Sequence, residues 1–175
     1  ATPEVYNFSL DEAFPIFLGA ADADISKVVQ RELKKQGLDI KLGAKLAKAE
    51  VKKDGVHLAY TDKDGEQKLT VDKLLVAVGR RAYTEGLLAD DTGVKLDERS
   101  RIVVDEHCHT GVDGVWAVGD AVRGPMVAHK GFEEGMAVAE WIAGKAGHVS
   151  YDTIPWVIYT EPEIAWAGKT EKQLQ

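Results

Sequence analysis

The chain has 175 residues, of which 45% are hydrophobic and 29% charged, and its formal net charge is −7. This acidic balance without a basic cluster argues against a nucleic-acid partner, and no apolar run approaches the roughly 20 residues that span a bilayer. A single cysteine excludes an internal disulfide and a metal cage built from thiolates. We therefore expect an acidic, soluble, intracellular protein.

The first part of the chain predicts a strand, a helix and a second strand. Residues 5–10, VYNFSL, are rich in β-forming residues. Residues 22–37 place their apolar side chains on one stripe and end at Gly37, which is typical of an amphipathic helix and its C-terminal stop. Residues 38–43, LDIKLG, indicate a strand that follows the helix.

From residue 44 to residue 78 apolar and polar residues alternate, which predicts an antiparallel meander. Asp-Gly pairs at 54–55 and 64–65 supply its hairpin turns, because glycine adopts the positive φ that such turns need. The last segment, KLLVAVG (73–79), is almost wholly apolar, so we expect a strand that is buried on both faces.

Two further strands and a helix are expected in the second half of the chain. The strands are residues 101–110, RIVVDEHCHT, and residues 115–118. After a short Gly-Pro loop, helical periodicity runs over about 127–144 and ends at a glycine.

The end of the strand at 115–118 is the main candidate for a binding site. Asp120 lies there, at the edge where open α/β sheets bind ligands, and its carboxylate can accept hydrogen bonds from sugar or polyol hydroxyls. Gly119 allows a ligand to approach the backbone. The unpaired N–H groups at the start of the next helix, near Val127, suit an electron-rich ligand atom. A turn-capping role for Asp120 explains the same spacing, and the residues alone leave both interpretations open.

Other candidate residues have simpler explanations. His129 lies in a first helical turn, where an exposed or hydrogen-bonded side chain is commoner than a base or a ligand. His107, Cys108 and His109 alternate in an expected strand and cannot all face one ion, so we expect no metal site. No electropositive setting activates the thiol as a nucleophile. Gly79 by itself indicates an ordinary turn.

Several aromatic residues gather near the end of the chain. They could stack against a ligand, but aromatic side chains buried at an interface are the commoner pattern, and we favour that role. The residues are Tyr151, Trp156, Tyr159 and Trp166.

Four segments, taken together, resemble the flavoprotein disulfide reductase family: KLLVAVGRR, GVWAVGDAV, GPMVAHKGFEEG and IPWVIYTEPEIAWAGKTE. Their order and spacing match over residues 12–175. The segments MVAHK and YTEPEIAWAGKTE favour the branch that oxidises dihydrolipoamide over the glutathione and mercuric reductases. The chain departs from the family at Ala82 and Tyr83, where proline and asparagine are usual, and at Ser100, where glycine is common.

The resemblance implies an α/β fold made of parts of two Rossmann-like nucleotide-binding domains, with a parallel sheet and an antiparallel β-meander, and the start of an α+β dimerisation domain. Residues 1–78 would be the later part of the NAD-binding domain, residues 79–148 the returning segment of the FAD-binding domain, and residues 149–175 the start of the dimerisation domain. The chain carries no G-x-G-x-x-G motif, no C-x4-C redox disulfide and no C-terminal His-Glu base pair. We therefore expect an incomplete fragment that is inactive alone and contributes no catalytic residue.

The resemblance also implies contacts with two cofactors. Asp120, next to Gly119, would hydrogen-bond the ribitol chain of FAD. The backbone at the start of the helix would lie against the pyrimidine edge of the flavin, at Met126, Val127, Ala128 and His129. Gly79 would lie near the bound NAD, and Glu12, counted back from the Ala-Ala-Asp at 20–22, would hold its adenosine ribose.

The function that the resemblance implies is FAD-dependent oxidation of dihydrolipoamide groups, with NAD as acceptor, in 2-oxoacid dehydrogenase complexes. Its partners would be lipoyl domains, other subunits of such a complex, and a second copy in a homodimer. The compartment would be the cytoplasm of a bacterium or the mitochondrial matrix. Two alternatives stay open: another disulfide reductase of the family, of the glutathione or mercuric type, and a non-catalytic binding module that reuses the fold.

Overall fold

The computed structural model describes residues 6–8 and 18–175, and the chain divides into two compact units. Unit 1 comprises Ala1–Val78, Ile158–Ile164 and Lys169–Gln175. Unit 2 comprises Gly79–Val157 and Ala165–Gly168. Each unit has its own buried side chains and is described separately below.

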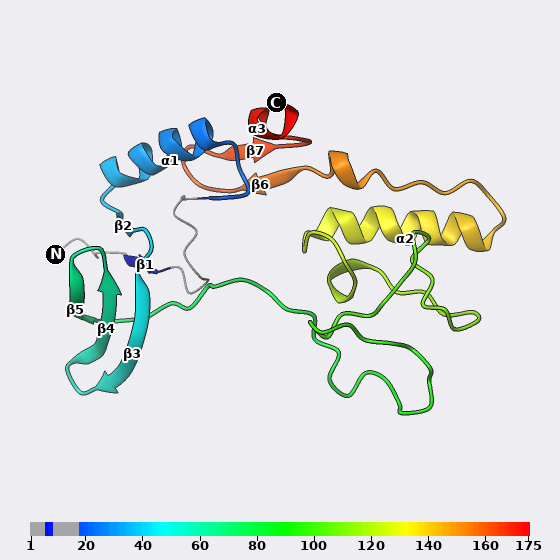
Figure 1. Cartoon of the computed structure of the whole chain (residues 1–175), viewed down its shortest axis with the longest axis horizontal. Helices are drawn as coiled ribbons and strands as arrows, with labels where there is room; N and C mark the ends of the chain where they lie inside the picture. The colour runs from blue at the N-terminus through cyan, green and yellow to red at the C-terminus, as the bar shows by residue number, and fades with distance from the viewer. Residues whose placement is uncertain (1–5, 9–17) are drawn as a thin grey trace. The chain divides into compact units, whose positions relative to one another are not determined.

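Unit 1 begins with a strand, a helix and a parallel strand. Strand β1 (Tyr6–Phe8) pairs in parallel with β2 (Asp39–Lys41), and helix α1 (Ala23–Lys35) lies between them in the chain (Figure 1). Asp22 caps the helix, because its carboxylate accepts a hydrogen bond from the Asp24 N–H at 3.0 Å. The expected order of strand, helix and strand is confirmed.

The meander is the main sheet of unit 1. Strands β3 (Lys45–Lys52), β4 (Gly55–Asp62) and β5 (Gly65–Val71) pair antiparallel in the order β3-β4-β5 (Figure 1). Leu58 and Tyr60 on the central strand are buried. The glycines that open β4 and β5 have φ of 135° and 97°, which L side chains rarely adopt. The expected meander and its glycine turns are confirmed.

The expected strand at 73–79 is wrong in this structure. The segment has no regular secondary structure, and Leu75 and Val76 are 88% and 61% exposed. A strand buried on both faces needs a hydrogen-bonded neighbour at its edge and packing on each face. No strand among the described residues pairs with this segment.

The two expected strands of unit 2 are also wrong as continuous strands. Residues 101–110 and 115–118 form no ladder in the described chain, only isolated bridges that join Leu96 to Ile102 and His109 to Trp116. Each of these bridges is a single residue pair.

A local hydrogen-bonded turn interrupts the first of these segments. One carboxylate oxygen of Asp105 accepts the backbone N–H groups of His107 and His109, at 2.8 and 2.9 Å. Cys108, between them, has a φ of 60°. Aspartate favours such turns because its side chain competes with the sheet for nearby backbone donors. The residues that were expected to alternate along a strand therefore lie in a turn.

The helical part of unit 2 follows the expected pattern. Helix α2 (Ala128–Ile142) ends before Gly144, whose φ is 69°. A short 3-10 turn, η1 (Gly119–Ala121), precedes it. Toward the end of the chain lie η2 (Tyr151–Thr153), β6 (Trp156–Ile158), β7 (Ile164–Trp166) and α3 (Glu171–Leu174).

Among the described residues, no helix has the length and apolar character that crossing a membrane requires.

Candidate functional site

The turn η1 and helix α2 pack against each other in unit 2. Gly119 opens the turn with a φ of 75°, a conformation that glycine adopts without strain. Gly131 lies on the side of α2 that faces this turn, and a Cβ atom added to it would lie only 3.3 Å from the Cα of Gly119. Glycine at both positions therefore lets the two backbones meet closely, and the end of the expected strand converges with the start of the helix.

The Asp120 side chain lies at the rim of this contact. It is 37% exposed, and its Oδ2 accepts a hydrogen bond from the Nη2 of Arg80 at 2.6 Å. No backbone N–H of the described residues donates to this carboxylate, so the turn-capping interpretation gains no support. Its second oxygen, Oδ1, has no partner in the described chain and can accept a hydrogen bond from a ligand.

The first turn of α2 has free backbone donors. Val127 is the N-cap residue and offers no side-chain acceptor. The Lys130 N–H donates to the carbonyl of Val127 at 3.2 Å, but the N–H groups of Ala128 and His129 meet no acceptor within the described residues. These donors and the positive end of the helix dipole favour an electron-rich atom at this position.

His129 has a structural partner. Its Nε2 lies 2.6 Å from the carbonyl oxygen of Pro155, so this nitrogen carries the proton and donates it. The imidazole is therefore held by the backbone, which agrees with the simpler of the two interpretations.

A buried ion pair lies beneath the turn, and the sequence analysis missed it. Lys130 and Glu134 are both 0% exposed, with Nζ 3.1 Å from Oε2. The Lys130 ammonium also donates to the carbonyl oxygens of Gly119 and Arg123, at 2.8 and 3.0 Å. Glu134 Oε2 accepts the backbone N–H of Gly119 at 2.7 Å. The i,i+4 spacing of the pair was visible in the sequence, but that spacing is equally typical of an exposed helix face.

Tyr151 and Cys108 extend this buried network. The Tyr151 hydroxyl donates to Glu134 Oε1 at 3.0 Å and lies 3.8 Å from the Cys108 sulfur. Burial raises the pKa of the Tyr151 hydroxyl, and its hydrogen bonds to Cys108 and Glu134 raise it further. Burial likewise raises the pKa of the Cys108 thiol above its ordinary value. The thiol is therefore protonated and inaccessible, which is unfavourable for a nucleophile.

The other residues that were predicted to contact a cofactor do not join the group around Asp120. Gly79 is exposed, with a φ of 122°, and only its chain neighbour Arg80 reaches Asp120. Met126 is partly buried in the loop before α2. Glu12 lies outside the described residues. The described part of the chain contains no group of three or more His, Cys, Asp or Glu residues that could hold a metal ion.

The aromatic residues near the end of the chain do not share one surface. Trp156 and Trp166 stack on each other, with ring centroids 5.6 Å apart and planes 2° from parallel. Tyr159 is 84% exposed, whereas Tyr151 belongs to the buried network.

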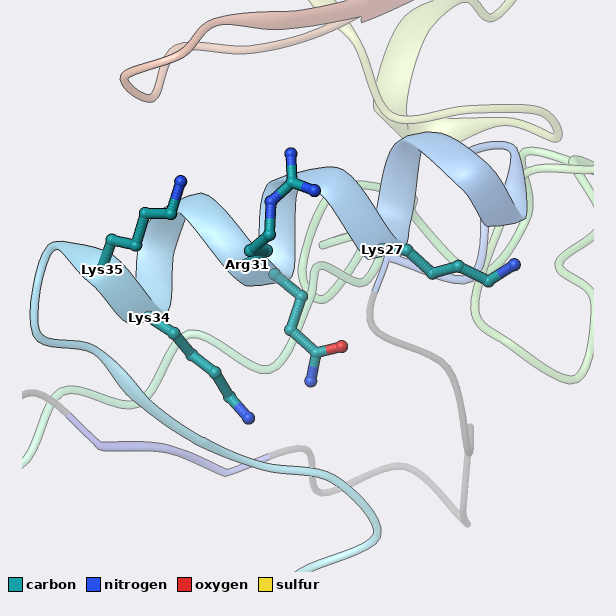
Figure 2. Close-up of a pocket in the computed structure, with 5 residues that line it drawn as sticks. Lys27, Arg31, Lys34 and Lys35 are labelled. Atoms are coloured by element: carbon teal, nitrogen blue, oxygen red, sulfur yellow. The ribbon is translucent and has the colours of Figure 1, made fainter.

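A surface hollow on α1 is lined mainly by basic side chains, but these side chains do not form a ligand-binding site. Figure 2 shows its labelled cations, which point away from one another rather than toward a common centre. Exposed ion pairs also neutralise three of them, since Lys27 pairs with Asp24, and both Arg31 and Lys35 pair with Glu32.

Taken together, the site in unit 2 offers one carboxylate oxygen as an acceptor and two backbone N–H groups as donors. This set can bind a ligand that carries hydroxyl groups and an electron-rich edge.

A family comparison and individual relatives place this chain among the same group of proteins. The family described as "Pyridine nucleotide-disulphide oxidoreductase" matches residues 6–135. A dihydrolipoyl dehydrogenase of Cupriavidus necator is 54% identical over 165 residues, which are 94% of this chain and 35% of that protein. A mitochondrial dihydrolipoyl dehydrogenase of Pisum sativum is 46% identical over 156 residues, 88% of this chain and 31% of that protein.

A solved structure agrees over nearly the whole chain. The HOCl-induced flavoprotein disulfide reductase RclA from Escherichia coli is 28% identical, with a TM-score of 0.83, and the match covers 98% of this chain and 38% of that one. The chain therefore spans about a third of the length of the relatives that it matches.

Proposed function

This chain belongs to the pyridine nucleotide-disulphide oxidoreductase family, and from that premise we propose that it is part of a dihydrolipoyl dehydrogenase. The proposed activity is FAD-dependent oxidation of dihydrolipoamide groups with NAD as acceptor. The observation that carries the proposal is the 54% identity to a dihydrolipoyl dehydrogenase across 94% of the chain.

The residues of unit 2 fit a flavin. The Oδ1 of Asp120, which has no partner among the described residues, would accept a hydrogen bond from a ribitol hydroxyl, and the N–H groups of Ala128 and His129 would face the pyrimidine edge. The positive end of α2 favours the negative charge that gathers at this edge on reduction. When it is bound, FAD supplies the two-electron redox chemistry between the thiols and the nicotinamide. The part of this chain is to bind and orient it, with Gly119 and residues 126–129 as the backbone contacts.

The proposed domain assignment follows the same family pattern. Residues 1–78 would belong to the NAD-binding domain, with Glu12 and Gly79 near the NAD. Residues 79–148 would return to the FAD-binding domain, and residues 149–175 would begin the dimerisation domain. We propose a second copy, lipoyl domains and other subunits of a 2-oxoacid dehydrogenase complex as partners. The proposed compartment is a bacterial cytoplasm or, for a mitochondrial form, the matrix.

Substrate choice tests the proposed activity. The longer protein that contains this chain should reduce NAD with dihydrolipoamide and should show little activity with glutathione disulfide or mercuric ion. A preference for either of these with a nicotinamide donor would move the protein to another branch of the family. The absence of turnover with all of them, in a protein that retains flavin, would favour a non-catalytic module.

Asp120 tests the flavin contact. In the longer protein, Asp120→Ala should weaken FAD binding by about 1–3 kcal/mol, because it removes the acceptor of a buried ligand hydroxyl. Asp120→Asn keeps a carbonyl acceptor and should lose less affinity. Dissociation constants from titration of the apoprotein measure both effects, and unchanged FAD affinity in Asp120→Ala would contradict the assignment.

A further inference from the structure

We propose that Lys130 and Glu134 are positioning residues of the flavin site, whose buried ion pair fixes the Gly119–Asp120 peptide against the first turn of α2. This inference rests on the proposed function, because it assigns a role in binding FAD. Neither side chain is proposed to touch the cofactor.

The ion pair holds Gly119 from both sides. Glu134 accepts its N–H at 2.7 Å, and Lys130 donates to its carbonyl oxygen at 2.8 Å. That carbonyl belongs to the peptide group that joins Gly119 to Asp120. A tie to this peptide therefore restricts the direction in which the Asp120 side chain leaves the backbone.

Every polar atom of the pair is used. The Lys130 ammonium donates to Gly119 O, to Arg123 O and to the carboxylate of Glu134. Each oxygen of that carboxylate also has a second donor, the Gly119 N–H for Oε2 and the Tyr151 hydroxyl for Oε1. A buried pair with all its hydrogen bonds satisfied holds its surroundings in one geometry.

Stability alone does not explain such a pair. Two charges at 0% exposure lose their hydration, and apolar side chains of similar volume often stabilise a fold equally well or better. Apolar side chains could not, however, bind both backbone groups of Gly119. The directional contact with the turn is therefore the feature that distinguishes this pair from a packed apolar core.

Close backbone packing supports the same assignment independently. A Cβ atom on Gly131 would lie 3.3 Å from the Cα of Gly119, and a Cβ atom on Gly124 would lie 3.3 Å from the Cδ of Lys130. The turn and the lysine side chain therefore have little freedom to shift. Gly135, on the same helix, has no atom within 4 Å of an added Cβ.

Variants of Lys130 and Glu134 can show whether the pair positions the turn for FAD or only neutralises two buried charges. In the longer protein, Lys130→Met and Glu134→Gln should each lower the thermal midpoint of the apoprotein, because each leaves one buried charge unpaired. The double variant removes both charges, so its thermal midpoint should recover. Its FAD dissociation constant should nevertheless stay at least about tenfold above that of the wild type, because Lys130 no longer holds the Gly119 carbonyl. A double variant with recovered stability and wild-type FAD affinity would overturn the inference.

A neutral variant keeps the test decisive if the charge variants do not fold. Gly131→Ala leaves both charges of the ion pair in place, but its β-carbon would lie 3.3 Å from the Gly119 Cα, so the turn must shift and FAD affinity should fall. Gly135→Ala and Glu133→Gln, at positions with open space and an exposed side chain, are matched controls that should leave FAD affinity unchanged. Wild-type affinity in Gly131→Ala would contradict the inference.

The wild-type protein separates the two proposals. If it does not bind FAD at all, both the proposed function and this inference fail. If it binds FAD and all the variants bind equally well, only the inference fails.

Discussion

Cys108 and Tyr151 illustrate, at the scale of single residues, how burial determines the protonation of a side chain. The Cys108 side chain is 0% exposed, and its main polar neighbour is the Tyr151 hydroxyl, 3.8 Å away. Both pKa values are raised, and burial is the main cause for both. The folded state therefore holds both protons more tightly than the unfolded chain does.

This difference predicts a loss of stability in alkaline solution. The ordinary pKa of the thiol is 9.0 and its folded pKa is higher, so the unfolded chain loses this proton first as the pH rises. The free energy of unfolding should then fall with increasing pH above that value. Thermal midpoints from about pH 8 to about pH 10 measure the effect. Cys108→Ala should flatten the first part of this fall, and an equally steep fall in this variant would contradict the assignment to the thiol.

At the scale of elements, the meander depends on two glycine turns that are not equivalent. Both Gly55 and Gly65 have positive φ. A Cβ atom on Gly55 would lie 2.7 Å from the backbone oxygen of Val71, whereas one on Gly65 would have no atom within 4 Å. The turn at Gly55 is therefore constrained both by its own backbone conformation and by the neighbouring strand.

Alanine substitution separates these two constraints. Gly65→Ala should destabilise unit 1 by about 1 kcal/mol or slightly more, the cost of a positive φ in an L residue. Gly55→Ala should cost clearly more, because the β-carbon also collides with a backbone carbonyl that cannot move aside. Thermal unfolding followed by the β-sheet circular dichroism signal compares the two variants. Equal losses would show that the contact with Val71 relaxes freely.

Elements with local causes were the ones that the sequence could predict. Helix α1 and the meander follow from apolar periodicity, a glycine that ends the helix and Asp-Gly turns, all signals within a few residues of one another. The strands expected at 73–79, 101–110 and 115–118 needed partners distant in the chain, which apolar composition cannot specify. In the second of these, the Asp105 side chain binds the backbone donors that a strand would have used.

In the candidate site, too, some residues could be predicted from local sequence signals and others depend on tertiary packing. Gly119, Asp120 and the start of α2 could be found, because a glycine-aspartate pair before a helix is a local signal. Lys130 and Glu134 could not, since only tertiary packing makes their helix face the buried one. Ser100, outside this site, has a φ of 59°, a backbone conformation that favours glycine, the residue common at this position in the family. The residue type alone did not predict that conformation.

At the scale of the whole molecule, the chain spans about a third of the relatives that it matches and contains only part of the proposed FAD site. In the proposed site, unit 2 would offer the acceptor for the ribitol, at Asp120, and the helix end for the flavin ring, at the start of α2. The 175 residues contain no glycine-rich motif for the pyrophosphate of a dinucleotide. In the proposed enzyme, most of the binding energy for FAD would therefore come from residues outside this chain.

The isolated 175-residue chain should consequently bind FAD weakly or not at all. Purified chain should be colourless, and titration with FAD should change the flavin fluorescence little at concentrations that saturate the longer protein. A yellow preparation that keeps its visible absorbance through dialysis would contradict this prediction. It would show that Asp120 and the first turn of α2 hold the flavin without a pyrophosphate loop.

The tryptophans of this chain are divided unequally between its units. The edge-on contacts of Trp116 with His109 and of Trp141 with His107, and the stacked Trp156 and Trp166, all lie in unit 2. Since the chain has four tryptophans in total, unit 1 has none. Intrinsic emission excited at the indole band is thus a built-in optical probe for unit 2 alone, and the melting of that unit can be followed without any attached dye.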